Sequence, residues 1–157
     1  MRGPKAASAL VFLLGCATSP EAPTSSATLS GAPTVVHAHV DQGVVTYAGA
    51  VYHKWIVSLS PTEGCASQAV ASIELNTLSS VTAMPAGPSP LRPQQATIAT
   101  LPSAFLTYQD ATLTSGTVTI DSATADYTSG SLNAQVTLAG APTTLTATFG
   151  APICAAP

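Results

Sequence analysis

The chain has 157 residues, of which four are Lys or Arg and seven are Asp or Glu. After residue 5 the only basic residues are Lys54 and Arg92. Binding to nucleic-acid phosphates, or to anionic lipid by charge alone, requires clustered basic residues, so this composition excludes both kinds of partner.

The first fifteen residues have the pattern of a secretory signal peptide. Arg2 and Lys5 give a basic start, and residues 6–14 follow as a run of nine residues with a single hydroxyl, Ser8. This length is typical of the apolar part of a signal peptide, whereas a membrane-spanning helix needs about 20 apolar residues. We therefore predict that residues 1–15 are a signal peptide.

The end of this leader, Leu13-Leu14-Gly15-Cys16, resembles the lipobox of bacterial lipoproteins. The resemblance implies that the Cys16 thiol takes a diacylglyceryl group and that the mature chain begins at this cysteine. Two or three acyl chains, at roughly 0.8 kcal/mol per buried CH₂, hold a protein on a membrane nearly permanently. The alternative is an ordinary signal peptide that is cut further along, with Cys16 left unmodified.

The next segment, residues 17–33, has the composition of a tether. It consists largely of Ser, Thr, Pro and Ala, with one Leu and no aromatic residue. Such a segment cannot bury a core, so we predict that residues 16–33 are the lipidated cysteine and a disordered linker. Residues 34–157 then remain as one domain of ordinary size.

The hydrophobic pattern of this domain has the period of β-strands. In residues 131–138 the apolar side chains of Leu132, Ala134, Val136 and Leu138 alternate with polar ones, and residues 116–121 and 143–149 repeat the pattern. This alternation predicts antiparallel strands with one buried face. Further strands are predicted at residues 34–41, 44–47, 51–59, 69–75, 96–101 and 104–109, with turns at 41–43, 60–64 and 139–142.

Two segments are harder to interpret. Residues 66–78 are rich in Ala, so a short helical turn is an alternative to the strand. Residues 84–93 contain four prolines, which lack the amide donor, and are predicted to form a surface connection outside any central ladder. Taken together, the elements predict an all-β fold, a single antiparallel β-sandwich or barrel-like domain.

Cys65 and Cys154 remain as a pair once Cys16 carries lipid. An exported protein meets an oxidising compartment, so we predict a disulfide between them. It would fasten the last strand to the loop after the strand that contains Trp55.

The order of "WIVSLS" running into "GC", a Pro-rich connection, "SGTVTI", "SGSLNAQVTL" and "TFGAPIC" resembles that of small β-rich lipoproteins of myxobacteria and related bacteria. The matching positions are Gly116, Thr117, Val118, Ile120, Gly130, Phe149, Ala151, Pro152 and Cys154. Most members of this group have no known activity. The resemblance therefore implies a fold and an envelope location, and it adds no catalytic residue.

The sharpest local constellation is "HAHVD", in which His37, His39 and Asp41 would share one face of a strand. Two imidazoles two residues apart can bind one Zn²⁺ or Cu²⁺ ion, and His53 on a neighbouring strand could be a third ligand. The alternative is a solvated polar face.

The aromatic residues with polar groups could form a surface cluster that stacks on a sugar or a protein partner. They are Tyr47, Tyr52, Trp55 and Tyr108. For Trp55, core packing is the simpler interpretation, because Ile56, Val57 and Leu59 surround it in the sequence.

No catalytic or cofactor motif is present: the sequence has no nucleophile elbow, no Gly-rich phosphate loop and no H-E-x-x-H. We predict a non-enzymatic envelope lipoprotein without a cofactor, bound to the membrane through Cys16 and acting by binding or structurally, with an unspecified protein or glycan partner. Ala17 follows Cys16 where an inner-membrane retention signal would have Asp, which favours the outer membrane. The alternatives are a metal-binding lipoprotein that uses His37 and His39 and, more distantly, a small hydrolase.

Overall fold

The computed structural model describes residues 24–47, 49–78, 81, 83–93 and 103–154, and among them it has nine strands and no helix. The strands are β1 (Ser26–Leu29), β2 (His37–Tyr47), β3 (Ala50–Ser60), β4 (Ala71–Leu78), β5 (Gly87–Arg92), β6 (Ser103–Tyr108), β7 (Thr112–Ala123), β8 (Tyr127–Leu138) and β9 (Ala141–Pro152). The predicted all-β fold is confirmed.

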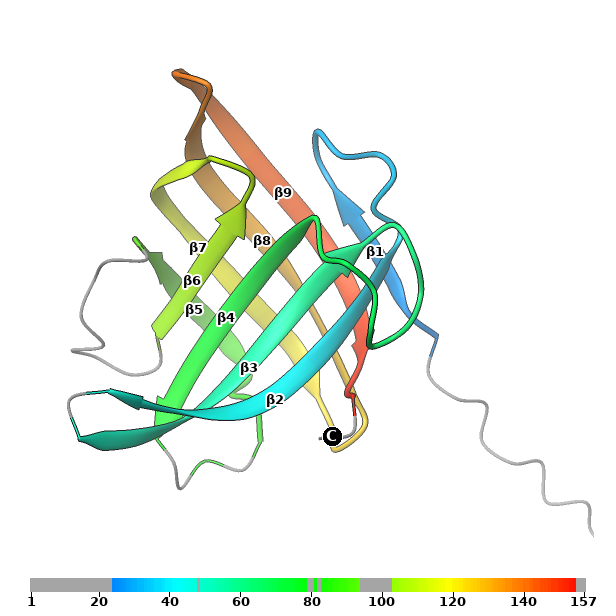
Figure 1. The fold of residues 1–157 in the computed structure, drawn as a ribbon, viewed down its shortest axis with the longest axis vertical. Coiled ribbons are helices and arrows are strands. Elements are labelled where there is room, and N and C mark those ends of the chain that lie inside the picture. Colours follow the sequence, from blue (N-terminus) through cyan, green and yellow to red (C-terminus); the bar gives the residue numbers. More distant parts are fainter. Residues whose placement is uncertain (1–23, 48, 79–80, 82, 94–102, 155–157) are drawn as a thin grey trace, which may run out of the picture.

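The nine strands form one nearly closed, barrel-like sheet in the order β1-β9-β8-β7-β5-β6-β4-β3-β2 (Figure 1). Neighbouring strands are antiparallel except β5 and β6, which pair in parallel through Leu91 and Arg92. The sheet closes beside β2, where Val40 forms a parallel bridge with Ile153. The segment that follows β9 therefore lies beside β2, at the other side of the sheet order.

A second contact closes the same seam near β1. The Ser25 hydroxyl donates to the Ala38 carbonyl at 2.7 Å and accepts from the Ala38 amide at 2.8 Å. A side chain that precedes β1 thus satisfies both backbone groups of one residue in β2, where no neighbouring strand supplies partners.

Alternate residues of the strands fill the interior, as the period of two predicts. On β3 the inward residues are Trp55, Val57 and Leu59, each at most 2% exposed. The alternating positions predicted on β8 and β9 are also buried, with the exception of the half-buried Leu138 at the end of β8. The core is therefore a single apolar cluster inside the curved sheet.

The turn predicted at residues 41–43 is wrong, because β2 runs unbroken through them. Gly43 pairs with Lys54 inside the β2–β3 ladder, and the chain reverses only after Tyr47. Gly49 has a φ of +81° there, a conformation that glycine adopts at low cost. The helical alternative for residues 66–78 is also wrong, since β4 occupies most of that range.

The Pro-rich segment is a strand, which corrects the prediction of a surface connection. Pro88 and Pro90 occupy alternate positions of β5, so their nitrogen atoms face the same edge. On the β6 side, β5 pairs only at Leu91 and Arg92, beyond both prolines. On the β7 side, Pro88 and Pro90 stand opposite Thr119 and Thr117, so the prolines are accommodated within a paired strand.

The predicted linker extends too far, because residues 26–29 form β1 against β9. Ala27 and Leu29 are buried opposite Phe149 and Ala147, while Ser26 and Thr28 face outward. Burial of two apolar side chains is therefore sufficient to hold this short edge strand in the sheet, although the segment around it is rich in Ser and Thr. The predicted signal peptide, Cys16 and the strand predicted at 96–101 lie outside the described residues.

Candidate functional site

The predicted disulfide between Cys65 and Cys154 is present, and it joins positions 89 residues apart. Cys65 belongs to the loop between β3 and β4, and Cys154 follows β9. The Cys154 amide donates to the Val40 carbonyl at 2.7 Å, so the staple lies beside β2. This places the disulfide next to the "HAHVD" segment.

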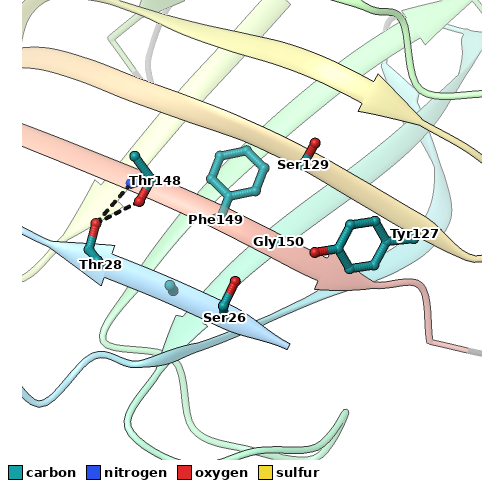
Figure 2. Close-up of a pocket in the computed structure, with 8 residues that line it drawn as sticks. Ser26, Thr28, Tyr127, Ser129, Thr148, Phe149 and Gly150 are labelled. Carbon is teal, nitrogen blue, oxygen red and sulfur yellow. Dashed lines mark hydrogen bonds between the residues drawn. The ribbon is translucent and has the colours of Figure 1, made fainter. Parts of the chain in front are cut away.

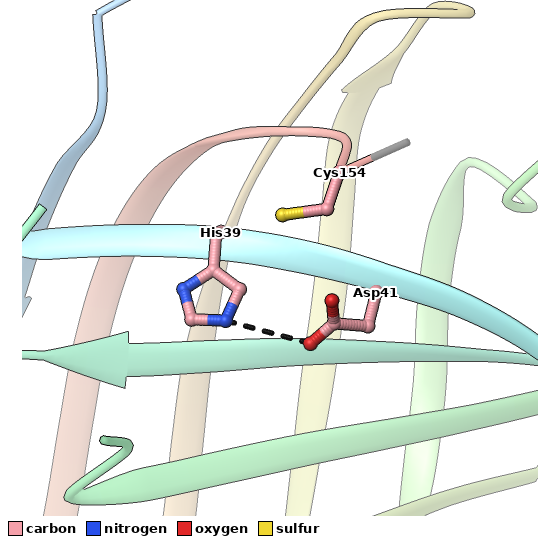
Figure 3. Close-up of side chains that lie close together, drawn as sticks. All are labelled: His39, Asp41 and Cys154. Carbon is pink, nitrogen blue, oxygen red and sulfur yellow. Dashed lines mark ion pairs between the residues drawn. The ribbon is translucent and has the colours of Figure 1, made fainter. Parts of the chain in front are cut away.

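His39 and Asp41 point to the same side of β2, beside Cys154 (Figure 3). His39 is only 3% exposed, although the sequence suggested a solvated face. Its Nε2 lies 3.4 Å from Asp41 Oδ2, and its Nδ1 lies 3.4 Å from Ser67 Oγ. The disulfide-bearing loop and the chain end explain the burial.

The three histidines do not converge. His37 pairs with Ser60 on β3, and its Nδ1 is buried without a hydrogen-bond partner. His53 lies five positions along β3 from Ser58, the partner of His39, which is roughly 17 Å at about 3.3 Å per residue. The proposed set of His37, His39 and His53 is therefore not a single metal site in this structure.

His53 has structural partners of its own. Its Nδ1 donates to the Val81 carbonyl, and its ring meets that of Trp55 edge-on, with the ring centroids 5.2 Å apart. These contacts position the loop after β4 against the end of the barrel.

A different set of possible ligands does converge. His39, Asp41 and Cys154 each contribute one possible ligand atom, and these three atoms lie within 4.8 Å of one another. The Cys154 sulfur is bonded to Cys65, so this oxidised form offers only an imidazole and a carboxylate to a metal ion. The "HAHVD" pattern indicates the first two residues, but no local signal indicates the cysteine.

Ser67, His39 and Asp41 also form a chain of the residue types found in a hydrolase triad. The Ser67 hydroxyl lies closer to two other partners than to His39: the Gly64 carbonyl at 2.7 Å and the Ser60 hydroxyl at 3.0 Å. Neither of the two cavities described below includes any of the three residues. The hydrolase alternative thus gains no support from this arrangement, which instead holds the loop onto β2.

A cavity of 340 Å³ lies at the end of the barrel. Its apolar lining comes from Trp55, Met84 and Ile153, and Gln42 and Thr124 add polar groups. Gln42 is the direct partner of Trp55 in the β2–β3 ladder, so both side chains lie on the same face of the sheet, with Trp55 buried and Gln42 exposed. Trp55 is thus a core residue, as expected, and also one wall of a cavity.

A second, shallower depression of 280 Å³ follows the β1–β9–β8 surface (Figure 2). Tyr127 and Phe149 line it together with the hydroxyls of Ser26, Ser129 and Thr148. Of the four aromatic residues that were predicted to form a surface cluster, the side chain of Tyr47 lies outside the described part of the structure, and the other three do not line this depression. Trp55 and Tyr108 are both buried, and Tyr52 is half-buried on β3.

Comparison with protein-family models, with curated proteins and with solved structures gave no match. The resemblance to myxobacterial lipoproteins therefore stays a prediction. Over the part of the chain that the structure describes, no helix has the length and hydropathy needed to span a membrane.

Proposed function

We propose that the protein is a lipid-anchored component of the bacterial cell envelope, located in the outer membrane, whose β domain acts by binding and not by catalysis. The observation that carries the proposal is the leader: a basic start, an apolar run too short to span a membrane, and Leu13-Leu14-Gly15-Cys16 at its end. In this arrangement Cys16 carries the lipid, and Ala17 favours the outer membrane.

The disulfide supports export. Cytosolic thiols are kept reduced, whereas Cys65 and Cys154 are bonded and close a long loop. With Cys16 carrying lipid, every cysteine of the chain has an assigned role.

The short distance along the chain from Cys16 to the start of the domain limits how far the domain can lie from the membrane. Only seven residues lie between Cys16 and Thr24, where the described part begins. Even fully extended, this stretch separates the two residues by at most about 29 Å. The domain is thus held close to the lipid headgroups, nearer than a linker ending at residue 33 would hold it.

Detergent phase separation tests the anchor. The full chain, expressed in a Gram-negative host, should enter the detergent phase, and Cys16→Ser should leave that phase or accumulate as the uncut precursor. The matched control is Cys65→Ser with Cys154→Ser, which removes the other two thiols and should still enter the detergent phase. Identical partition and processing of the wild type and Cys16→Ser would contradict the anchor.

The cavity at the barrel end is the best candidate for the binding role. Its 340 Å³ falls within the range of about 300–1,000 Å³ typical of small-molecule sites, and an apolar lining with a few polar groups is the usual composition. A small, mostly apolar molecule with a group that can hydrogen-bond to Gln42 would suit it.

Binding of a fluorescent naphthalene-sulfonate dye tests the cavity. Ala125 lies on the rim in the exposed β7–β8 turn, so Ala125→Phe should fill the cavity and lower dye fluorescence without unfolding the domain. Ala141→Phe is the control: Ala141 is exposed at the start of β9, beside the opposite end of β8, and its substitution should leave the fluorescence unchanged. Equal dye fluorescence in the two variants would exclude this cavity as the site.

A further inference from the structure

Side chains that can bind a metal ion lie beside the Cys65–Cys154 disulfide. Cys154, His39 and Asp41 already bring a sulfur, a nitrogen and an oxygen atom within 4.8 Å of one another (Figure 3). The Cys65 sulfur is not part of this group of three, but it is bonded to that of Cys154 and therefore lies next to it. Two sulfurs, an imidazole and a carboxylate are together a complete ligand set for Zn²⁺.

We propose that this is a redox-dependent zinc site: when the disulfide is reduced, Cys65, Cys154, His39 and Asp41 bind one Zn²⁺ ion. The inference goes beyond the proposed function and does not depend on the lipid anchor. It also revises the metal hypothesis from the sequence, because Asp41 and the two cysteines replace His37 and His53 as partners of His39.

The spacing of the ligands is suitable for a tetrahedral ion. Zn²⁺ binds sulfur at about 2.3 Å and nitrogen or oxygen at about 2.0 to 2.2 Å, which places neighbouring ligand atoms about 3.3 to 3.8 Å apart. His39 Nε2 and Asp41 Oδ2 are already 3.4 Å apart. The separations of the Cys154 sulfur from these two groups, at most 4.8 Å, need to close by about 1 Å, which side-chain rotation can supply. The Cys65 sulfur, which is bonded to that of Cys154, takes the fourth ligand position by moving away from it when the bond opens.

The backbone positions of three ligands do not depend on the disulfide. His39 and Asp41 belong to the β2–β3 ladder, and the amide of Cys154 donates to Val40 between them. Cys65 is exposed in its loop and can adjust when the bond opens. Reduction would therefore free two thiols without dispersing the set.

Ser67 adds support next to the first ligand. Its hydroxyl lies 3.4 Å from His39 Nδ1, the nitrogen that faces away from Asp41. A partner on the second ring nitrogen orients a histidine whose first nitrogen binds a metal. Asp41, with its side chain 46% exposed, provides the route from solvent to the otherwise buried His39.

The chemistry balances with a dithiol as reductant. The dithiol supplies two electrons and two protons, the S–S bond breaks into two thiols, and the dithiol becomes a disulfide. Zn²⁺ then binds the two thiolates, neutral His39 and ionised Asp41, and the two thiol protons go to solvent. Two thiolates with an imidazole select Zn²⁺ over Mg²⁺ or Ca²⁺, which prefer all-oxygen sites.

The test uses the full chain with Cys16→Ser in detergent, so that only Cys65 and Cys154 can supply thiols. After reduction by a phosphine, Co²⁺ as a probe for the Zn²⁺ site should bind one per chain and give a thiolate-to-cobalt absorption band, and Zn²⁺ should displace it. The oxidised chain should show no band. In competition with a chelating dye, His39→Gln or Asp41→Asn should weaken Zn²⁺ binding by about tenfold or more.

The matched control is His37→Gln, on the same face of β2 but outside the cluster, which should bind Zn²⁺ like the parent chain. Fluorescence of Trp55, the only tryptophan and 2% exposed, reports whether the reduced chain stays folded. Absence of the band in the reduced chain, whether folded or not, would overturn the proposal. Equal Zn²⁺ affinity in His39→Gln and His37→Gln would also overturn it.

Discussion

Replacing both bonded cysteines by serine should lower the stability of the domain by several kcal/mol. The bond joins residues 89 positions apart, and closing a loop of that length in the unfolded chain corresponds to about 4.6 kcal/mol at 25 °C in the chain-entropy model. The folded state should change little, because the Val40–Ile153 bridge and the Cys154 amide bond do not involve sulfur. The variant should still fold.

Urea unfolding followed by Trp55 fluorescence measures this difference. With an m-value of about 1.5 kcal/mol/M, a loss of about 4.6 kcal/mol moves the unfolding midpoint down by about 3 M. The wild type reduced without metal should unfold at the same urea concentration as the Cys65→Ser, Cys154→Ser variant. A shift of less than about 0.5 M in both would mean that the bond contributes under about 1 kcal/mol, and the loop-closure reasoning would be wrong.

Three further substitutions test the packing and closure of the barrel. Gly130→Ala should lower the free energy of unfolding by about 1–3 kcal/mol, because the added methyl group would meet the backbone of β7 and an aromatic ring of β9. Gly43→Ala has open space around the added methyl group and should be nearly neutral. Equal urea midpoints of the two variants would refute this reasoning. Thr128→Val removes a buried hydroxyl that has no partner and should stabilise by about 1 kcal/mol, so a lower thermal midpoint would reveal a bond that the hydroxyl makes. Ser25→Ala should cost about 1–3 kcal/mol and speed hydrogen exchange of the Ala38 amide, and unchanged exchange there would show that Ser25 does not close the seam.

The strands with one buried and one wet face could be predicted from the sequence, because burial imposes the alternation seen in residues 131–138. The elements that were missed lack this signal. β1 buries only Ala27 and Leu29 within a Ser- and Thr-rich stretch, and β5 carries prolines that usually exclude a strand. Gly43 suggests a turn, yet it pairs within an unbroken ladder, because strand propensity depends on neighbours that the sequence does not display.

The candidate sites, like the strands, could be predicted from the sequence only where a local pattern marks them. The period of two places His39 and Asp41 together, and the count of cysteines indicates the disulfide. That these two features meet depends on barrel closure, which brings Ile153 beside Val40 from the far end of the chain. The barrel-end cavity likewise combines β2, β3, the β7–β8 turn and residue 153, so no local pattern could have indicated it.

Mass spectrometry of the N-terminal peptide of the protein isolated from membranes shows whether Cys16 carries lipid. We expect a chain that begins at Cys16, with a diacylglyceryl group on the sulfur and an acyl group on the freed amine. A Cys16 peptide with an unmodified thiol, or a mature chain that begins after residue 16, would contradict it.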